Sequence, residues 1–184
     1  DVSDFTALAL LKVQHFHLKF SWRPAARASP EKLKFAEPLD LVSMGFGRRL
    51  LSKLSNTQSL VLSFSGCKGT RNLAALADDL SSLTQLKRYT MCFEKTDIAD
   101  VMFLKHGLGC LTELRHLDAN FNGCDSLADV SALGVVGSMQ KLVSLSIDLS
   151  GCGKLASVDA IGSGIGDLQE LEHLSLSLAD TRVS

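Results

Sequence analysis

Residues 108–121, LGCLTELRHLDANF, decide the fold together with their counterpart at residues 136–149, VGSMQKLVSLSIDL. In both stretches apolar residues recur at intervals of three, three, three, two and two. Spacing of three or four places side chains on one face of a helix, whereas spacing of two places them on one face of a strand. Each stretch therefore predicts the end of a helix, a turn and a short strand.

The same apolar frame occurs six times along the 184 residues, and each occurrence is called a unit here. The fourth position of the frame falls on Phe16, Leu60, Tyr89, Leu117, Leu145 and Leu174, so that after a longer first step the frame recurs with a period of 28–29. Repeats of this length are typical of stacked architectures, because one unit cannot bury its own apolar faces. We therefore expect one α/β domain over residues 1–184, with about six units, a parallel sheet on the concave side and helices on the convex side.

The residues of the fourth unit also carry a family resemblance. Leu114-x-x-Leu117-x-Ala119-x-x-Asn122 resembles the leucine-rich-repeat consensus Leu-x-x-Leu-x-Leu-x-x-Asn/Cys, and the period of 28–29 is similar to the ribonuclease-inhibitor-like class. The phrases at residues 64–67 and 126–134 resemble repeat arrays of dinoflagellate proteins. The resemblance covers nearly all of the chain except residues 22–49, and it implies a horseshoe-shaped solenoid with a binding role.

Two regions depart from the regular repeat. The first step, from Phe16 to Leu60, is longer than the others, and the surplus falls within residues 22–49, which contain all three prolines. This pattern predicts an insertion in the first unit. Neither end has the sequence of a polar cap, so we expect the solenoid to continue or another molecule to cover Leu174, Leu176 and Leu178.

Composition argues against several classes of partner. The net charge of −1, from 19 basic and 20 acidic residues, gives no electrostatic support for nucleic-acid binding. The longest apolar run, residues 7–11, is too short to insert in a membrane. The five cysteines form an odd set without Cys-x-x-Cys pairs, and Asn-x-Ser/Thr sites are absent. These features favour an intracellular location, in the cytoplasm or an organelle lumen or matrix, over secretion.

The expected concave face carries the side chains that alternate with the apolar frame positions. Asp118 and Asp148, near Arg88 and His116, form its richest polar cluster. The alternative is that these side chains are only the solvated side of a sheet. The candidate binding residues of this face are Lys19, Arg88, His116, Asp118, Asn120, Asp148 and His173.

Chemistry-bearing motifs are weak throughout the chain. His15-x-His17 could bind a metal from one strand, but the neighbouring strand offers no third ligand. Cys67, Cys124 and Cys152 share one place in their units, where we expect them to pack inward. Gly107, Gly134 and Gly162 are expected to relieve crowding or to end a helix. A phosphate-binding loop and a nucleophile elbow are absent from the sequence, so we predict no catalytic residues, no cofactor and no metal.

These features favour a non-catalytic interaction or scaffolding module, in the specific form of a structural subunit of a larger assembly. It would bind a protein partner through the concave face, the insertion at residues 22–49 or the open ends of the stack. The alternative is the substrate-recognition region of a larger enzyme, such as a ligase or a kinase, whose catalytic domain lies outside this chain.

Overall fold

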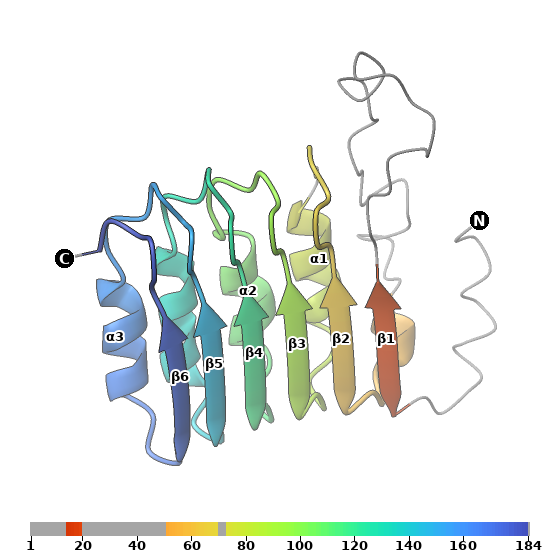
Figure 1. Ribbon diagram of the computed structural model, residues 1–184. Helices are drawn as coiled ribbons and strands as arrows, with labels where there is room; N and C mark the ends of the chain where they lie inside the picture. Colours follow the sequence, from red (N-terminus) through yellow and green to blue (C-terminus); the bar gives the residue numbers. More distant parts are fainter. Residues whose placement is uncertain (1–13, 20–50, 70–72, 184) are drawn as a thin grey trace, which may run out of the picture.

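The computed structural model of the protein describes residues 14–19, 51–69 and 73–183. Within these ranges six parallel strands form one sheet, and their order in space is their order in the chain (Figure 1). The strands are β1 (His15–Lys19), β2 (Ser59–Ser63), β3 (Arg88–Cys92), β4 (His116–Asn120), β5 (Ser144–Asp148) and β6 (His173–Ser177). The predicted α/β class and the parallel sheet are confirmed.

Between the strands lie short helices. They are the 3-10 helix η3 (Leu51–Leu54), α1 (Leu73–Leu80), α2 (Leu104–Gly109), the 3-10 helix η4 (Ser131–Ser138) and α3 (Asp159–Gly166). Unit 5 has a 3-10 helix where units 3, 4 and 6 have α-helices. The sequence SALGVVGS of η4 contains two glycines and two adjacent valines, which are poor α-helix formers. The repeat frame predicts the place of each helix but not its type.

Strand pairing follows the apolar frame without a shift. Leu117 of β4 lies beside Tyr89 of β3 and Leu145 of β5, and the outer pairs place Phe16 beside Leu60 and Leu145 beside Leu174. A slip by one residue would turn every apolar side chain to the opposite face of the sheet. The predicted register is therefore confirmed in all six strands.

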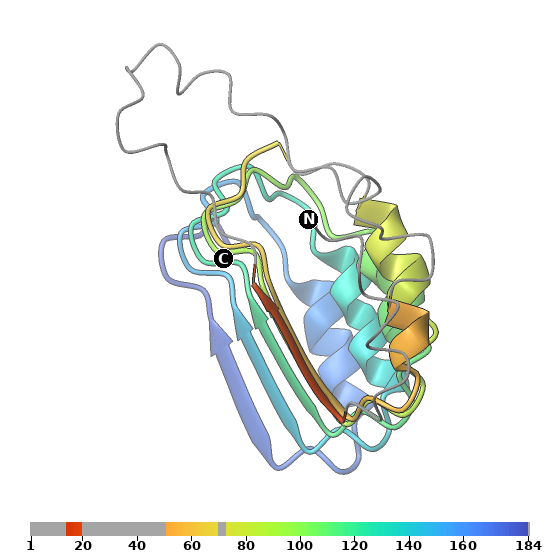
Figure 2. The ribbon, with the colours of Figure 1, turned by 90° about the vertical axis from the view of Figure 1, so that its right-hand side faces the viewer.

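The helices lie along one side of the sheet, and the other side carries none of the described helices (Figure 2). Frame residues fill the layer between sheet and helices: Leu60, Leu62, Met91 and Leu142 are all fully buried. Near the strand ends three phenylalanines stack, with ring centroids 5.1 Å apart for Phe64 and Phe93 and 5.8 Å apart for Phe93 and Phe121. Burial of each such side chain stabilises the fold by roughly 1.5–3 kcal/mol, so this layer holds the units together.

Successive helical segments approach so closely that glycine is required at their contacts. A Cβ on Gly107 would lie 3.0 Å from the carbonyl oxygen of Ala77, and one on Gly134 would lie 2.8 Å from that of Ala160. A Cβ on Gly164 would lie 2.5 Å from the carbonyl oxygen of Gly134. The prediction that glycines relieve crowding is confirmed at Gly107 and Gly134. At Gly162 it is wrong for the described residues, because none of them lies within 4 Å of the position of its Cβ.

The expected insertion at residues 22–49 lies outside the described residues, as does the helical half of the first unit before residue 14. Of the helices in the described ranges, none has both the length and the apolar character needed to cross a membrane.

Leu117→Asp is expected to destabilise the fold severely. The side chain of Leu117 is 2% exposed, and a carboxylate there would be buried without a partner. We expect a loss of about 4 kcal/mol or more in the free energy of unfolding, measured by urea denaturation. Ser59→Asp, on the opposite face of the sheet beside Arg88, should change it by less than about 0.5 kcal/mol. Equal losses in both variants would contradict the assignment of the two faces.

Two glycines of α3 should respond oppositely to alanine. Gly164→Ala forces a Cβ against the backbone of the preceding unit and should cost about 1–3 kcal/mol of stability. Gly162→Ala meets no atom within 4 Å and should stabilise by about 0.5–1 kcal/mol, because alanine is the better helix former. Thermal unfolding of the two variants measures both changes. Stabilisation by Gly164→Ala would refute the close approach at Gly164, and destabilisation by Gly162→Ala would refute the open space at Gly162.

Candidate binding surface

The side of the sheet without helices is called the open face here. Its side chains form three columns, because the in-register parallel strands place equivalent residues side by side. The first column holds His15, Ser59, Arg88, His116, Ser144 and His173; the second His17, Val61, Thr90, Asp118, Ser146 and Ser175; the third Lys19, Ser63, Cys92, Asn120, Asp148 and Ser177. The columns agree with those expected from the sequence.

Basic side chains meet in the first column, at the start of β3 and β4. Arg88 and His116 are neighbours in register, about 4.8 Å apart along the sheet. Partial burial lowers the pKa of His116, and the positive charges of Arg88, Arg115 and His173 lower it further. The neutral imidazole is therefore favoured in the folded state, so His116 can donate one hydrogen bond and accept another at neutral pH.

Two acidic side chains lie further along the open face, on β4 and β5. Asp118 is in the second column of β4 and Asp148 in the third column of β5. Partial burial raises the pKa of Asp118, and the nearby negative charge of Asp148 adds to the effect. No hydrogen bond of the Asp118 carboxylate occurs with any described residue. The open face thus holds a carboxylate that the rest of the described protein leaves uncompensated.

A shallow depression of about 420 Å³ brings Arg88 and His116 together with Asp118. It is lined by Arg88, Thr90, His116, Asp118, Ser144 and Ser146, together with Tyr89 and Leu117. The two ion pairs in the described residues, Lys95–Glu94 and Lys141–Glu113, involve none of these side chains. Arg88 and Asp118 are therefore both available to a ligand, a cation and an anion within one depression.

The structure does not bring all candidate residues together. Lys19 lies on β1, three strands from β4, and His173 lies on β6, two strands from His116. At about 4.8 Å per strand, these separations are about 14 and 10 Å. Neither side chain belongs to the depression at Arg88 and Asp118.

Asn120 and Asp148 have a local task at the ends of their strands. The Oδ1 atom of Asn120 accepts the backbone N–H of Asn122 at 2.9 Å, and Oδ1 of Asp148 accepts that of Ser150 at the same distance. Such side-chain bonds to the backbone two residues on stabilise the turn that follows. Asn120 and Asp148 therefore stabilise the turns that follow β4 and β5, in addition to lying on the open face.

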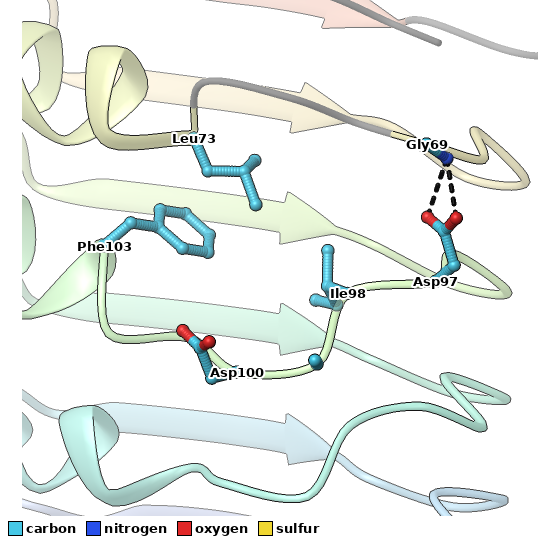
Figure 3. Close-up of a pocket in the computed structure, with 7 residues that line it drawn as sticks. Gly69, Leu73, Asp97, Ile98, Asp100 and Phe103 are labelled. Carbon is cyan, nitrogen blue, oxygen red and sulfur yellow. Dashed lines mark hydrogen bonds between the residues drawn. The ribbon is translucent and has the colours of Figure 1, made fainter.

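A second hollow, of about 360 Å³, lies among the loops that lead from the strands to the helices (Figure 3). The apolar side chains of Leu73, Ile98 and Phe103 line it, and Asp97 stands at one end (Figure 3). The carboxylate of Asp97 accepts the backbone N–H of Gly69 at 2.8 and 2.7 Å, which ties the loops of two units together. The hollow therefore lies between the loops of two units. The repeat frame of the sequence did not predict it.

Asp100, which also lines this hollow, belongs to a turn that recurs before each of the last three helical segments. Its Oδ1 accepts the N–H of Met102 at 3.0 Å, and Oδ1 of Asp129 accepts that of Ser131 at 2.8 Å. Ser157 plays the same part, since its Oγ accepts the N–H of Asp159 at 3.1 Å. These three positions recur once per unit, and this regular spacing was a signal in the sequence that could have revealed the turn.

The cysteines expected to pack inward are buried, as predicted: Cys67 is 5% exposed, and Cys124 and Cys152 are fully buried. The Sγ atoms of Cys124 and Cys152 donate to the carbonyl oxygens of Phe93 and Phe121, at 3.0 and 3.3 Å. Burial raises the pKa of the Cys124 thiol, and it raises that of Cys152 to about 11. Thiols with a raised pKa are poor nucleophiles. Cys124 and Cys152 instead connect successive units through their hydrogen bonds to Phe93 and Phe121.

In the described part of the chain, no group of three or more His, Cys, Asp or Glu side chains is arranged to hold a metal ion. His15 and His17 both lie on β1, on the open face, beside Ser59 and Val61 of β2. Their neighbours thus supply no ligand of the kind that zinc prefers.

Arg88→Ser should raise the pKa of His116. The substitution removes the positive charge that, among those near His116, opposes protonation of the imidazole most, and NMR titration of the His116 ring reports the change. Lys105→Ser, an exposed change on α2, is the control and should leave the titration unchanged. Because the folded state lowers this pKa, the unfolding free energy should fall as the pH drops below about 6.5, and less steeply in Arg88→Ser. An identical His116 titration in wild type and Arg88→Ser would show that the two side chains do not interact.

Comparison of the chain with known protein families and with curated proteins finds no match.

Proposed function

We propose that this chain is a leucine-rich-repeat solenoid of about six units that acts as a non-catalytic protein-interaction or scaffolding module within a larger assembly. Support for the solenoid comes from the regular period of the apolar frame, the unbroken register of six parallel strands and the helices along one side of the sheet. Each unit packs on the next along the described stack, as expected of a repeat protein.

The observation that carries the binding role is the pair of unsatisfied opposite charges on the open face. Arg88 and Asp118 lie on adjacent strands, line one depression and form no ion pair with each other. The residues around them are small and polar: Thr90, Ser144 and Ser146. A protein surface with a carboxylate for Arg88 and a basic side chain for Asp118 would be complementary to this arrangement.

A protein partner fits better than the other classes of ligand. The mixed charges of the depression do not favour a polyanion such as a nucleic acid, because Asp118 and Asp148 would repel its phosphates. The depression is shallow and rigidly supported by the sheet, without the convergent groups that an active site needs. A broad face of short side chains on a stiff scaffold can accept a protein surface with little loss of side-chain entropy.

The proposed location is intracellular. The five cysteines are all free in the structure, and three of them are fully or almost fully buried as thiols. A reducing compartment, the cytoplasm or an organelle lumen or matrix, suits a protein whose thiols serve as small buried side chains.

The test of the open face is a charge reversal in the cells from which the protein comes. Tagged wild type and an Arg88→Glu/Asp118→Arg variant would be isolated under native conditions, with companions quantified by mass spectrometry. The variant keeps the net charge and places each new charge beside an opposite or neutral neighbour, so the fold should be retained, as circular dichroism can verify. We expect a companion present in fixed ratio with wild type to fall by on the order of tenfold or more, because a complementary charge pair becomes repulsive.

The matched control reverses two exposed charges on the helical side, Asp78→Arg on α1 and Lys105→Glu on α2. This control should keep the companion at the wild-type ratio. Equal recovery from both variants would show that the open face does not make the contact, and a wild-type protein without companions would contradict the assembly.

A further inference from the structure

Basic residues gather where β3 and β4 begin, at the lower edge of the sheet in Figure 1. Lys87 directly precedes β3 and Arg88 is its first residue, and Arg115 and His116 hold the same places in β4. The two pairs lie side by side, because the N–H groups of Arg115 and His116 both donate to the carbonyl oxygen of Lys87, at 2.9 and 3.0 Å. These four residues are called the basic patch here.

The basic patch is two strands wide and reaches round the edge of the sheet. Side-chain direction alternates along a strand, so Arg88 and His116 point to the open face, whereas Lys87 and Arg115 point toward the helical side. In the units on either side the equivalent residues carry no charge: they are Gln58 and Ser59 before and in β2, and Val143 and Ser144 before and in β5. The patch is therefore a local feature of units 3 and 4 and not of the repeat.

The positive charges of the patch have little compensation within the described residues. Lys87, Arg88 and Arg115 are exposed, and none of them forms an ion pair with a described residue. The carboxylate of Glu113 accepts a hydrogen bond from Nζ of Lys141 at 2.6 Å, which lowers the pKa of Glu113, and the charges of Arg115 and Lys87 lower it further. On the helical side of the edge, three cations thus share one carboxylate.

A short run of carboxylates fits the basic patch better than a nucleic acid does. Like charges held side by side repel each other, and an anionic ligand relieves that repulsion. A nucleic acid carries a long row of phosphates, about one charge per 1.7 Å of duplex, and beyond the patch this row would meet Asp118 and Asp148 of the open face. A carboxylate, in contrast, matches the two parallel N–H groups of a guanidinium such as that of Arg88.

We infer that the basic patch binds an acidic segment of the protein partner, which crosses the edge of the sheet where β3 and β4 begin. One carboxylate lies between Arg88 and His116 on the open face, and a second lies between Lys87 and Arg115 beyond the edge. A basic residue of the partner then follows on the open face, opposite Asp118. This inference rests on the proposed protein-binding role of the open face and adds the chemistry of the partner, at least two aspartate or glutamate residues at close spacing.

The first test is a titration of the full chain with two acetylated peptides, hexaglutamate and hexaglutamine, followed by NMR at low salt. Hexaglutamate should shift the amide signals of Lys87, Arg88, Arg115 and His116, and hexaglutamine should leave them unchanged. Binding should also raise the pKa of His116, because the carboxylates offset the charges of Arg88 and Arg115, which lower this pKa in addition to burial. An edge that is only solvated would give neither change.

A matched pair of double variants tests the part of the patch beyond the open face. Lys87→Gln/Arg115→Gln should bind hexaglutamate roughly three- to tenfold more weakly, as expected for the loss of two exposed charge pairs. Lys105→Gln/Lys154→Gln removes the same charge from two exposed positions elsewhere, and it should bind like wild type at the same ionic strength. Equal weakening in both double variants would show that only the net charge matters and would overturn the inference.

Native isolation from the source cells separates this inference from the proposed function. The Lys87→Gln/Arg115→Gln variant should recover several-fold less of the companion than wild type does. Recovery at the wild-type ratio, with a loss only in Arg88→Glu/Asp118→Arg, would overturn the acidic segment and leave the binding role of the open face standing. Recovery at the wild-type ratio from both variants would contradict both proposals.

Two further results of the titration would overturn the inference. One is a set of hexaglutamate-induced shifts confined to residues outside the basic patch. The other is tighter binding of a thymidine oligonucleotide of the same charge at the patch, since phosphates and not carboxylates would then be the preferred ligand.

Discussion

The structure depends on the burial of frame leucines between a sheet and a row of short helices, which no unit can accomplish alone. A short strand and a short helix each have one apolar side, and together they leave that layer open at both ends. Only a neighbouring unit with the same frame closes the layer. The buried frame residues of units 2 to 5 are those on which another described unit packs, whereas no described unit packs on Leu174 and Leu176 of β6, which are 51% and 37% exposed.

This constraint also fixes where polar groups can lie. Because the strands pair in register, equivalent residues become neighbours, and a polar residue that recurs once per unit builds a row. Three kinds of row recur along the stack. Asp100, Asp129 and Ser157 organise the turns before the helices, and the buried thiols of Cys124 and Cys152 donate to the preceding unit. The glycines between helices form the third kind, and all of these rows serve the stack itself.

Arg88 and Asp118 are the charged side chains of the depression on the open face, where Thr90, Ser144 and Ser146 are their small polar neighbours. Neither Arg88 nor Asp118 forms an ion pair within the described chain. Partial burial raises the pKa of Asp118, so the fold bears a small cost to keep a carboxylate there at neutral pH. A group that destabilises its own fold and lacks an internal partner is a reasonable place to look for an external one.

The sequence by itself determined the strand positions, their register and the residues of each face. Side-chain direction alternates along a strand, so the spacing of two in the frame allows only one pairing that buries every leucine. The columns of the open face and the inward cysteines followed from the same rule. The tertiary structure decided what depends on distances between units: the 3-10 form of η4, the separation of Lys19 and His173 from Arg88 and Asp118, and the empty space beside Gly162. It also decided that Asn120 and Asp148 bond to the backbone of the turns that follow them. Periodicity states which side a residue faces, whereas its partners are set by how closely the neighbouring unit packs.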